Sequence, residues 1–127
     1  MAKAKELVVM LENRPGMLAK LGNALREADV NITAILASNQ PGKSPVHILV
    51  DNVPPARKAL QAQGFDVEER TVVTLELENR PGTLGTAMSK IALKGINIDY
   101  CYYSVTQGRS AFVVLGVKNP DRVAALL

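Results

Sequence analysis

Hydrophobic and polar positions change their period along the chain, and the changes predict alternating strands and helices. Residues 6–12 (ELVVMLE) form an apolar run that is typical of a strand. Leu18, Leu21 and Leu25 then recur every three or four residues, so they share one face of a helix. The order that follows is β-α-β-β-α-β, the split unit of ferredoxin-like folds. The predicted strands cover residues 6–12, 32–38, 46–51 and 65–70, the helices 18–28 and 52–64, and a turn 39–45.

The whole pattern occurs twice, at a constant offset of 66 residues (78 − 12). The stretch Leu-Glu-Asn-Arg-Pro-Gly at residues 11–16 recurs unchanged at residues 77–82. Val30-Asn31-Ile32 matches Ile96-Asn97-Ile98 at the same offset, and the register continues without a gap to Ala125-Leu126. A gapless repeat of this length indicates two copies of one structural unit.

The second copy predicts the same elements but stops before its fourth strand. The fold class is therefore α+β, with two ferredoxin-like βαββαβ units in tandem over residues 1–70 and 71–127. In the usual strand order the fourth strand lies beside the first, so residues 72–78 are expected to form an unpaired edge that is open to strand addition. The elements predicted in this copy are strands at 72–78, 98–105 and 109–117, a helix at 82–95, and a shortened helix at 119–127.

The junction between the copies contains no flexible linker. Residues 65–78 run from one predicted strand into the next without Pro or Gly, so the units are expected to be held closely. Several strands are apolar on both faces, whereas a sheet with helices on one side normally has one polar face. We expect the second face to be covered by the other copy or by a partner chain; scattered exposed apolar residues are the alternative.

The repeated turn has the properties of a site for a small zwitterion. Pro15 ends the strand because it cannot donate to a β-ladder, and Gly16 removes the Cβ where the chain turns most tightly. The helix that follows presents unpaired N–H groups, which favour a carboxylate or phosphate. The Asn13 side chain adds an acceptor and two donors. A turn of Asn, Pro and Gly also forms without any ligand, so the motif by itself leaves a purely structural role open.

The turn, its spacing and its repetition together resemble the ACT domain, a βαββαβ module that binds amino acids and regulates enzymes of amino-acid metabolism. The matching pattern is L-x-N-R-P-G-x-L after a strand, followed about a dozen residues later by [VI]-N-I, and it covers both copies. The closest picture is a free-standing tandem ACT protein, and the turn is similar to that of the serine-sensing domain of phosphoglycerate dehydrogenase. The resemblance implies ligand-binding residues at the two turns and at the start of each second strand: Asn13, Pro15, Gly16, Met17, Leu18, Asn31, Asn79, Pro81, Gly82, Thr83, Leu84 and Asn97.

In the family these two kinds of asparagine meet across an interface between neighbouring ACT units. The resemblance therefore implies pseudo-twofold packing, with Asn13 facing Asn97 and Asn79 facing Asn31, and a ligand that shifts how the units associate. The serine-sensing version has a histidine two residues before the turn asparagine, where this chain has Leu11 and Leu77. The change removes a polar contact and indicates a ligand with a more apolar side chain, or none.

Other chemistry finds little support in the composition. With one cysteine (Cys101), one histidine (His47) and no P-loop, dinucleotide or zinc motif, we expect no catalytic residue, no metal, no cofactor and no enzymatic activity. The single cysteine and the lack of a signal-peptide pattern favour a cytoplasmic protein. No apolar stretch reaches the roughly 20 residues that span a membrane. The net charge of +3 is too small to argue for nucleic acid. The cluster Tyr100, Tyr102 and Tyr103 is expected to pack in the core or an interface.

The function predicted from the sequence is therefore a regulatory sensor that binds a free amino acid, forms a homodimer and acts on an enzyme in trans. The main alternative is a ligand-free module for protein interaction or oligomerisation, which the expected open edge would serve. A third, weaker alternative is an RNA-binding βαββαβ domain, since similar sheets bind RNA but this one lacks basic residues among its aromatic ones.

Overall fold

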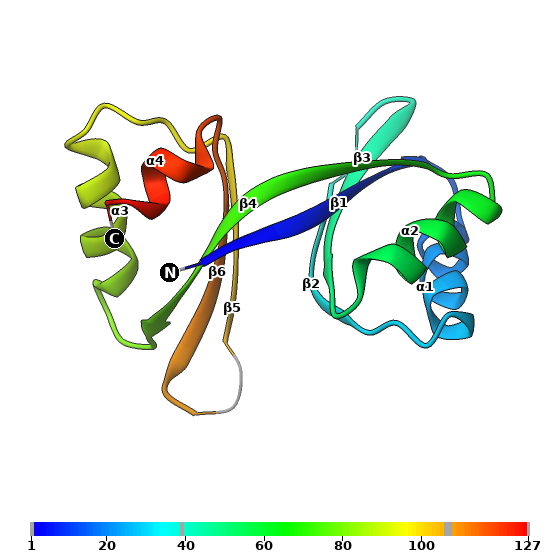
Figure 1. Ribbon diagram of the computed structural model, residues 1–127, viewed down its shortest axis with the longest axis horizontal. Helices are drawn as coiled ribbons and strands as arrows, with labels where there is room; N and C mark the ends of the chain where they lie inside the picture. The colour runs from blue at the N-terminus through cyan, green and yellow to red at the C-terminus, as the bar shows by residue number, and fades with distance from the viewer. Residues whose placement is uncertain (1, 39, 106–107, 127) are drawn as a thin grey trace. The chain divides into compact units, whose positions relative to one another are not determined.

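The computed structural model describes residues 2–38, 40–105 and 108–126, and Figure 1 shows its elements in chain order. These described residues form six strands and four helices, one strand fewer than the repeat predicts, because the predicted strands 65–70 and 72–78 are continuous. The elements are β1 (Ala2–Glu12), α1 (Met17–Glu27), β2 (Ile32–Ala37), β3 (Lys43–Val50), α2 (Val53–Ala62), β4 (Asp66–Glu78), α3 (Thr83–Ala92), β5 (Tyr100–Val105), β6 (Ser110–Gly116) and α4 (Pro120–Ala124).

The chain divides into two compact units, which we call the first and second units. The first unit is Lys5–Arg70, and the second is Thr71–Leu127 together with Met1–Ala4. Strands β1 and β4 contribute residues to both units. The α+β class and the ferredoxin-like order expected from the sequence are confirmed in each unit.

In the first unit the strands follow the order β2-β3-β1-β4. Strand β3 pairs antiparallel with β1 (Leu7 opposite Ile48) and with β2 (Ile35 opposite Ile48), so β1 and β2 run parallel to each other. Alternate residues of these strands point toward α1 and α2, which lie on the same side of the sheet (Figure 1). The core contains Leu7, Val9, Leu11, Leu21, Leu25, Val46, Ile48, Ala56 and Leu60, each at most 7% exposed.

In the second unit β6 lies between β4 and β5, and both pairings are antiparallel. Its core is smaller and contains Val73, Leu75, Ala87, Ile91, Val113, Leu115 and Val123, under α3 and α4. The expectation that residues 72–78 form an unpaired edge is wrong. Strand β4 has β1 as its other neighbour, and the Thr74 hydroxyl donates to the Ala2 carbonyl at 3.4 Å. In this structure β1 lies beside β4, where a fourth strand of the second unit is expected.

Several predicted boundaries also differ from the structure. Strand β4 runs unbroken through both predicted strands, 65–70 and 72–78. No residue between them disfavours the extended conformation of a strand. Strand β3 begins at Lys43 inside the predicted turn 39–45. Pro45 is tolerated in β3 because the described pairing with β2 ends at Val46. Its missing N–H therefore removes no hydrogen bond to β2.

Candidate functional site

The first repeated turn connects β1 to α1 and is held by the backbone. Gly16 precedes the helix with φ = 88°. Residues that carry a Cβ adopt this left-handed backbone conformation only with strain. The Asn13 N–H donates to the Gly42 carbonyl at 3.1 Å, and the Lys20 N–H donates to the Gly16 carbonyl at 2.9 Å. Within the part of the chain that the structure describes, no side chain caps the N-terminus of α1. Its first N–H groups are therefore available at the turn surface.

The second turn repeats this geometry between β4 and α3. Gly82 has φ = 90°, and the Thr86 N–H donates to its carbonyl at 3.0 Å. Here Thr83 differs from its counterpart Met17, since its hydroxyl donates to the Glu78 carbonyl at 2.7 Å. The same hydroxyl lies 3.1 Å from the Arg80 carbonyl, so it ties the turn to itself.

Both turns also carry the same exposed ion pair. Arg14 Nε donates to Glu12 Oε2 at 2.8 Å, and Arg80 Nε donates to Glu78 Oε2 at 2.5 Å. The Arg14 hydrogen bond, followed by the Arg14 charge, lowers the pKa of the Glu12 carboxyl below its ordinary value. All four side chains are more than half exposed, so the pairs contribute little to stability. They hold the arginines along the strand ends, and Glu12 and Arg14 also line the pocket at the first turn.

The first turn opens into a pocket of about 350 Å³, which we call the first turn pocket. Its turn wall contains the predicted ligand residues Asn13, Pro15, Gly16, Met17 and Leu18. Its other walls come from the end of β1, the end of β2 and the start of β3, through Leu11, Ala37, Ser38, Ser44 and Val46. The wall is mostly apolar, and Leu11, the residue that replaces the histidine of the serine-sensing version, forms part of it.

The second turn pocket, of about 330 Å³, has a different wall. It is formed by the end of β4, the turn and α3, with Glu76, Leu77, Glu78, Arg80, Pro81, Gly82, Thr83, Thr86, Ala87 and Lys90. Among the described residues, Asn79 does not line this pocket, although Asn13 lines the first one. The oxygen Oδ1 of Asn79 instead lies 3.5 Å from the hydroxyl of Tyr103 on β5. The predicted residue Leu84 is 37% exposed and is likewise absent from this wall.

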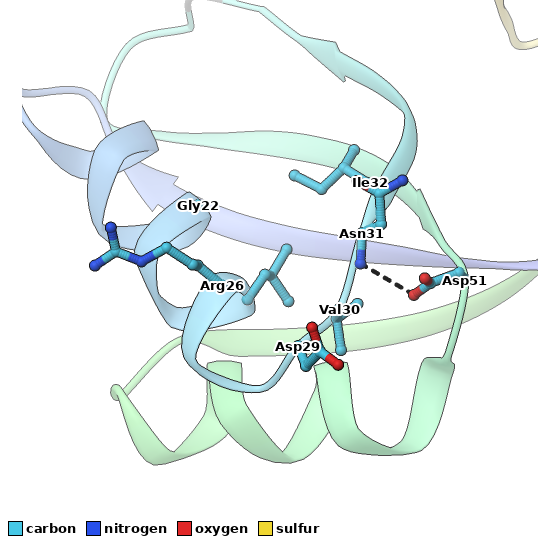
Figure 2. Close-up of a pocket in the computed structure, with 8 residues that line it drawn as sticks. Gly22, Arg26, Asp29, Val30, Asn31, Ile32 and Asp51 are labelled. Carbon is cyan, nitrogen blue, oxygen red and sulfur yellow. Dashed lines mark hydrogen bonds between the residues drawn. The ribbon is translucent and has the colours of Figure 1, made fainter.

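Asn31 lines a separate pocket of about 500 Å³ in the first unit, between the end of α1 and the start of β2. Figure 2 shows Asn31 beside Asp51, whose Oδ1 accepts the Asn31 N–H at 3.0 Å. Arg26 and Asp29 add charges to the same wall. In the second unit the corresponding Asn97 is exposed, and its Nδ2 donates to Asp99 Oδ1 at 3.3 Å.

A single unit does not bring the two predicted halves of the site together. Glu12, beside the turn, pairs with Lys43 at one end of β3, whereas Ile32, beside Asn31, pairs with Val50 at the other end. Seven residues of strand separate these positions, which is roughly 23 Å at about 3.3 Å per residue. An amino acid is much shorter than this. The pairing of a turn with a second-strand asparagine from another unit therefore stays a prediction.

Sequence reasoning missed a buried polar pair in the first unit. Glu6 is fully buried and its Oε1 lies 3.1 Å from Nδ1 of His47, which is 8% exposed. The second unit has Val72 and Val114 at the corresponding strand positions. This departure from the repeat was the one signal in the sequence that could have revealed the pair.

The described residues contain little else that suggests catalysis. Among them, no group of three or more His, Cys, Asp or Glu is placed to hold a metal ion. Burial raises the pKa of the Cys101 thiol, which disfavours the thiolate that a nucleophile requires. None of the helices in the described part of the chain has the length and apolar character to cross a membrane.

Comparisons with known proteins agree with this geometry. Residues 2–127 match the family described as ACT domain pair. An aspartokinase from Mycolicibacterium smegmatis is 32% identical over an alignment of 141 residues, which covers 98% of this chain but only 33% of that enzyme. The chain thus spans about a third of the length of this relative.

Solved structures show the same fold. Protein BT0572 from Bacteroides thetaiotaomicron superposes with a TM-score of 0.92 at 27% identity, over 98% of this chain and 86% of that one. The regulatory subunit of aspartate kinase from Thermus thermophilus, in a ligand-free form, superposes with a TM-score of 0.67 at 15% identity, over 99% of this chain and 95% of that one.

Proposed function

Because this chain belongs to the ACT domain family, as a pair of ACT units over residues 2–127, we propose that it is an amino-acid sensor whose ligand binds at the first turn pocket. Its fold is of the regulatory type, and the part of the aspartokinase that it matches is a third of that enzyme. The chain would act without catalysis of its own, by changing its association with an enzyme partner or with a second copy.

The observation that carries this proposal is the contrast between the two walls of the first turn pocket. One wall offers the uncapped N-terminus of α1 with Gly16, where a carboxylate can approach the backbone. The other walls carry the apolar side chains of Leu11, Ala37 and Val46 beside two serine hydroxyls. A hydrogen bond to a charged group contributes about 1.5–3 kcal/mol, and a buried Val or Leu side chain about 1.5–3 kcal/mol. Both terms suit a free amino acid with an aliphatic or thioether side chain.

A second ACT unit would complete the site by contributing its second-strand asparagine. Within one unit the turn and the second-strand asparagine lie roughly 23 Å apart, which supports a contribution from another unit. The homodimer expected from the sequence would supply further units. The ligand would then favour the assembled arrangement by its difference in affinity between the two states.

The test is a thermal-shift panel of the twenty amino acids. A ligand at a hundred times its dissociation constant stabilises the protein by about 2.7 kcal/mol. We expect L-valine, L-leucine, L-isoleucine or L-methionine to raise the melting temperature of the wild type and to lose most of this effect with Asn13→Ala. Asn23→Ala is the matched control, because Asn23 is exposed on α1 outside the pocket.

A ligand-free interaction module is the competing function, and specific residues favour it. In the first unit Leu18 and Ile35 are 51% and 44% exposed, and in the second unit Tyr103 and Val105 are 42% and 49% exposed. Such apolar side chains on the first helices and edge strands suit contact with another chain. No shift with any amino acid, together with a dimer in sedimentation experiments, would favour this module over the sensor.

A further inference from the structure

The two turn pockets differ most at one position of the repeat. Ala37 ends β2 and lines the first turn pocket. Its counterpart 66 residues later is Tyr103 on β5. The repeat thus exchanges a methyl group, which lines the first turn pocket, for a phenol.

The Tyr103 side chain is directed toward its own turn. It shares the β5 face of Cys101 and Val105, since these residues alternate along the strand, and its partner in β6 is the core residue Val113. This face is the one on which α3 packs. From it the Tyr103 hydroxyl reaches to 3.5 Å from Asn79 Oδ1, the predicted ligand group of the turn.

The two pockets lie on different sides of their turns. The first turn pocket extends from the turn across to β2 and β3, through Ala37, Ser38, Ser44 and Val46. The second turn pocket is bounded by β4, the turn and α3, and among the described residues it excludes Asn79. The space between turn and strand that is open beside Ala37 therefore adjoins a tyrosine in the second unit.

We propose that Tyr103 occupies at the second turn the place that the ligand's side chain takes at the first, so that the chain has one open amino-acid site rather than two equal ones. This inference rests on the proposed function, because it assumes that the first turn pocket binds an amino acid. The inference extends the proposed function by stating how many amino-acid sites the chain has and that Tyr103 determines this number. The phenol ring supplies the apolar contact and its hydroxyl meets the turn asparagine, as a bound amino acid would.

The test follows the backbone amides of both turns by ¹H–¹⁵N NMR during titration with L-leucine, and the stoichiometry by calorimetry. In the wild type we expect shifts at Gly16, Met17 and Leu18, unchanged signals at Gly82, Thr83 and Leu84, and one ligand per chain. Tyr103→Ala should bring the second set of amides into the titration. Ala37→Tyr should weaken binding at the first turn by roughly tenfold or more, which corresponds to about 1.4 kcal/mol.

Val105→Ala is the matched control, because Val105 lies on the same face of β5 and is 49% exposed. It should behave as the wild type does. Ala37 and Tyr103 are both exposed, so neither substitution is expected to unfold the protein; far-ultraviolet circular dichroism checks this.

Different results overturn the two proposals separately. Equal titration of both turns in the wild type would leave the proposed function standing and overturn the role of Tyr103. The same conclusion would follow if Tyr103→Ala left the second turn silent while the first turn still bound L-leucine. If neither turn responded to L-leucine, L-valine, L-isoleucine or L-methionine in the wild type and in Tyr103→Ala, the proposed function would fall and this inference with it.

Discussion

Tyr100 packs over Gly116, so the effect of Gly116→Ala on the free energy of unfolding should depend on whether Tyr100 is present. The two residues lie opposite each other on β5 and β6. A Cβ at Gly116 would lie 2.2 Å from Cε1 and Cζ of the Tyr100 ring. Carbon atoms in good contact are about 3.5–4.0 Å apart, so the ring would have to move by roughly 1.3–1.8 Å. Tyr100 also stacks on Tyr102, with ring centroids 6.5 Å apart, and this contact opposes the movement.

We therefore expect Gly116→Ala to lower the free energy of unfolding by about 1–3 kcal/mol, the usual cost of overpacking. In a Tyr100→Ala background the clash is absent. There the same change should be neutral or should stabilise by about 0.4–1 kcal/mol, because alanine restricts the unfolded chain. The double-mutant cycle should give a coupling energy of at least about 1 kcal/mol. In the first unit Ala34 lies opposite Leu49, so the large and the small side chain are exchanged between the two strands.

The assay is urea unfolding followed by far-ultraviolet circular dichroism, at one protein concentration for all variants. Gly85→Ala is the control, since a Cβ there meets nothing within 4 Å and alanine favours the helix. It should stabilise the protein by about 0.5–1 kcal/mol. If Gly116→Ala behaved like Gly85→Ala with Tyr100 present, the ring would not lie over Gly116 and the reasoning would be refuted.

Four further predictions concern the core, the shared strand, a helix cap and the thiol. Leu60→Ala, at a site with no exposed surface, should cost about 2–5 kcal/mol in urea unfolding; a cost below about 1 kcal/mol would contradict its place in the core. Deletion of residues 2–4 should expose the edge of β4 and lower hydrogen-exchange protection at Thr74, and unchanged protection would argue against the role of the chain start as a fourth strand. Asn119→Ala should cost about 0.5–2 kcal/mol by thermal unfolding, because the Asn119 side chain caps α4 at 3.1 Å; Asn119→Asp should retain most of the stability. Since burial raises the pKa of the Cys101 thiol, its reaction with a disulfide reagent at pH 8 should be slower than that of a cysteine peptide, and the gap should narrow as the pH rises.

The repeat period made the architecture of each unit predictable. Once residues 11–16 and 77–82 are aligned, local propensity agrees with the fold in both copies. The expected gapless register is wrong at β6, which is shifted by one residue, since Leu11 lies opposite Ser44 but Leu77 lies opposite Ala111. The helix starts at Met17 and Thr83 follow from glycines that adopt positive φ without strain. These features depend on neighbours in the chain, and such information is present in the sequence itself.

The errors concern contacts between distant residues. The pairing of the chain start with β4 joins residues 72 positions apart, as the hydrogen bond from Thr74 to Ala2 shows, and no local pattern encodes that choice. The burial of Glu6 was missed for a similar reason, because its partner His47 is 41 residues away. The predicted ligand residues were located at the two turns, but that Tyr103 reaches Asn79 depends on how β5 is placed beside the turn.

The central claim, that the first turn binds an amino acid through Asn13 and the start of α1, is tested most directly by calorimetric titration. The ligand is whichever of L-valine, L-leucine, L-isoleucine and L-methionine gives the largest thermal shift, and it is added to the wild type, Asn13→Ala and Asn23→Ala. We predict that Asn13→Ala raises the dissociation constant roughly tenfold or more, since it removes a hydrogen bond to a charged group, and that Asn23→Ala leaves it unchanged. Equal dissociation constants for the wild type and Asn13→Ala would contradict the account.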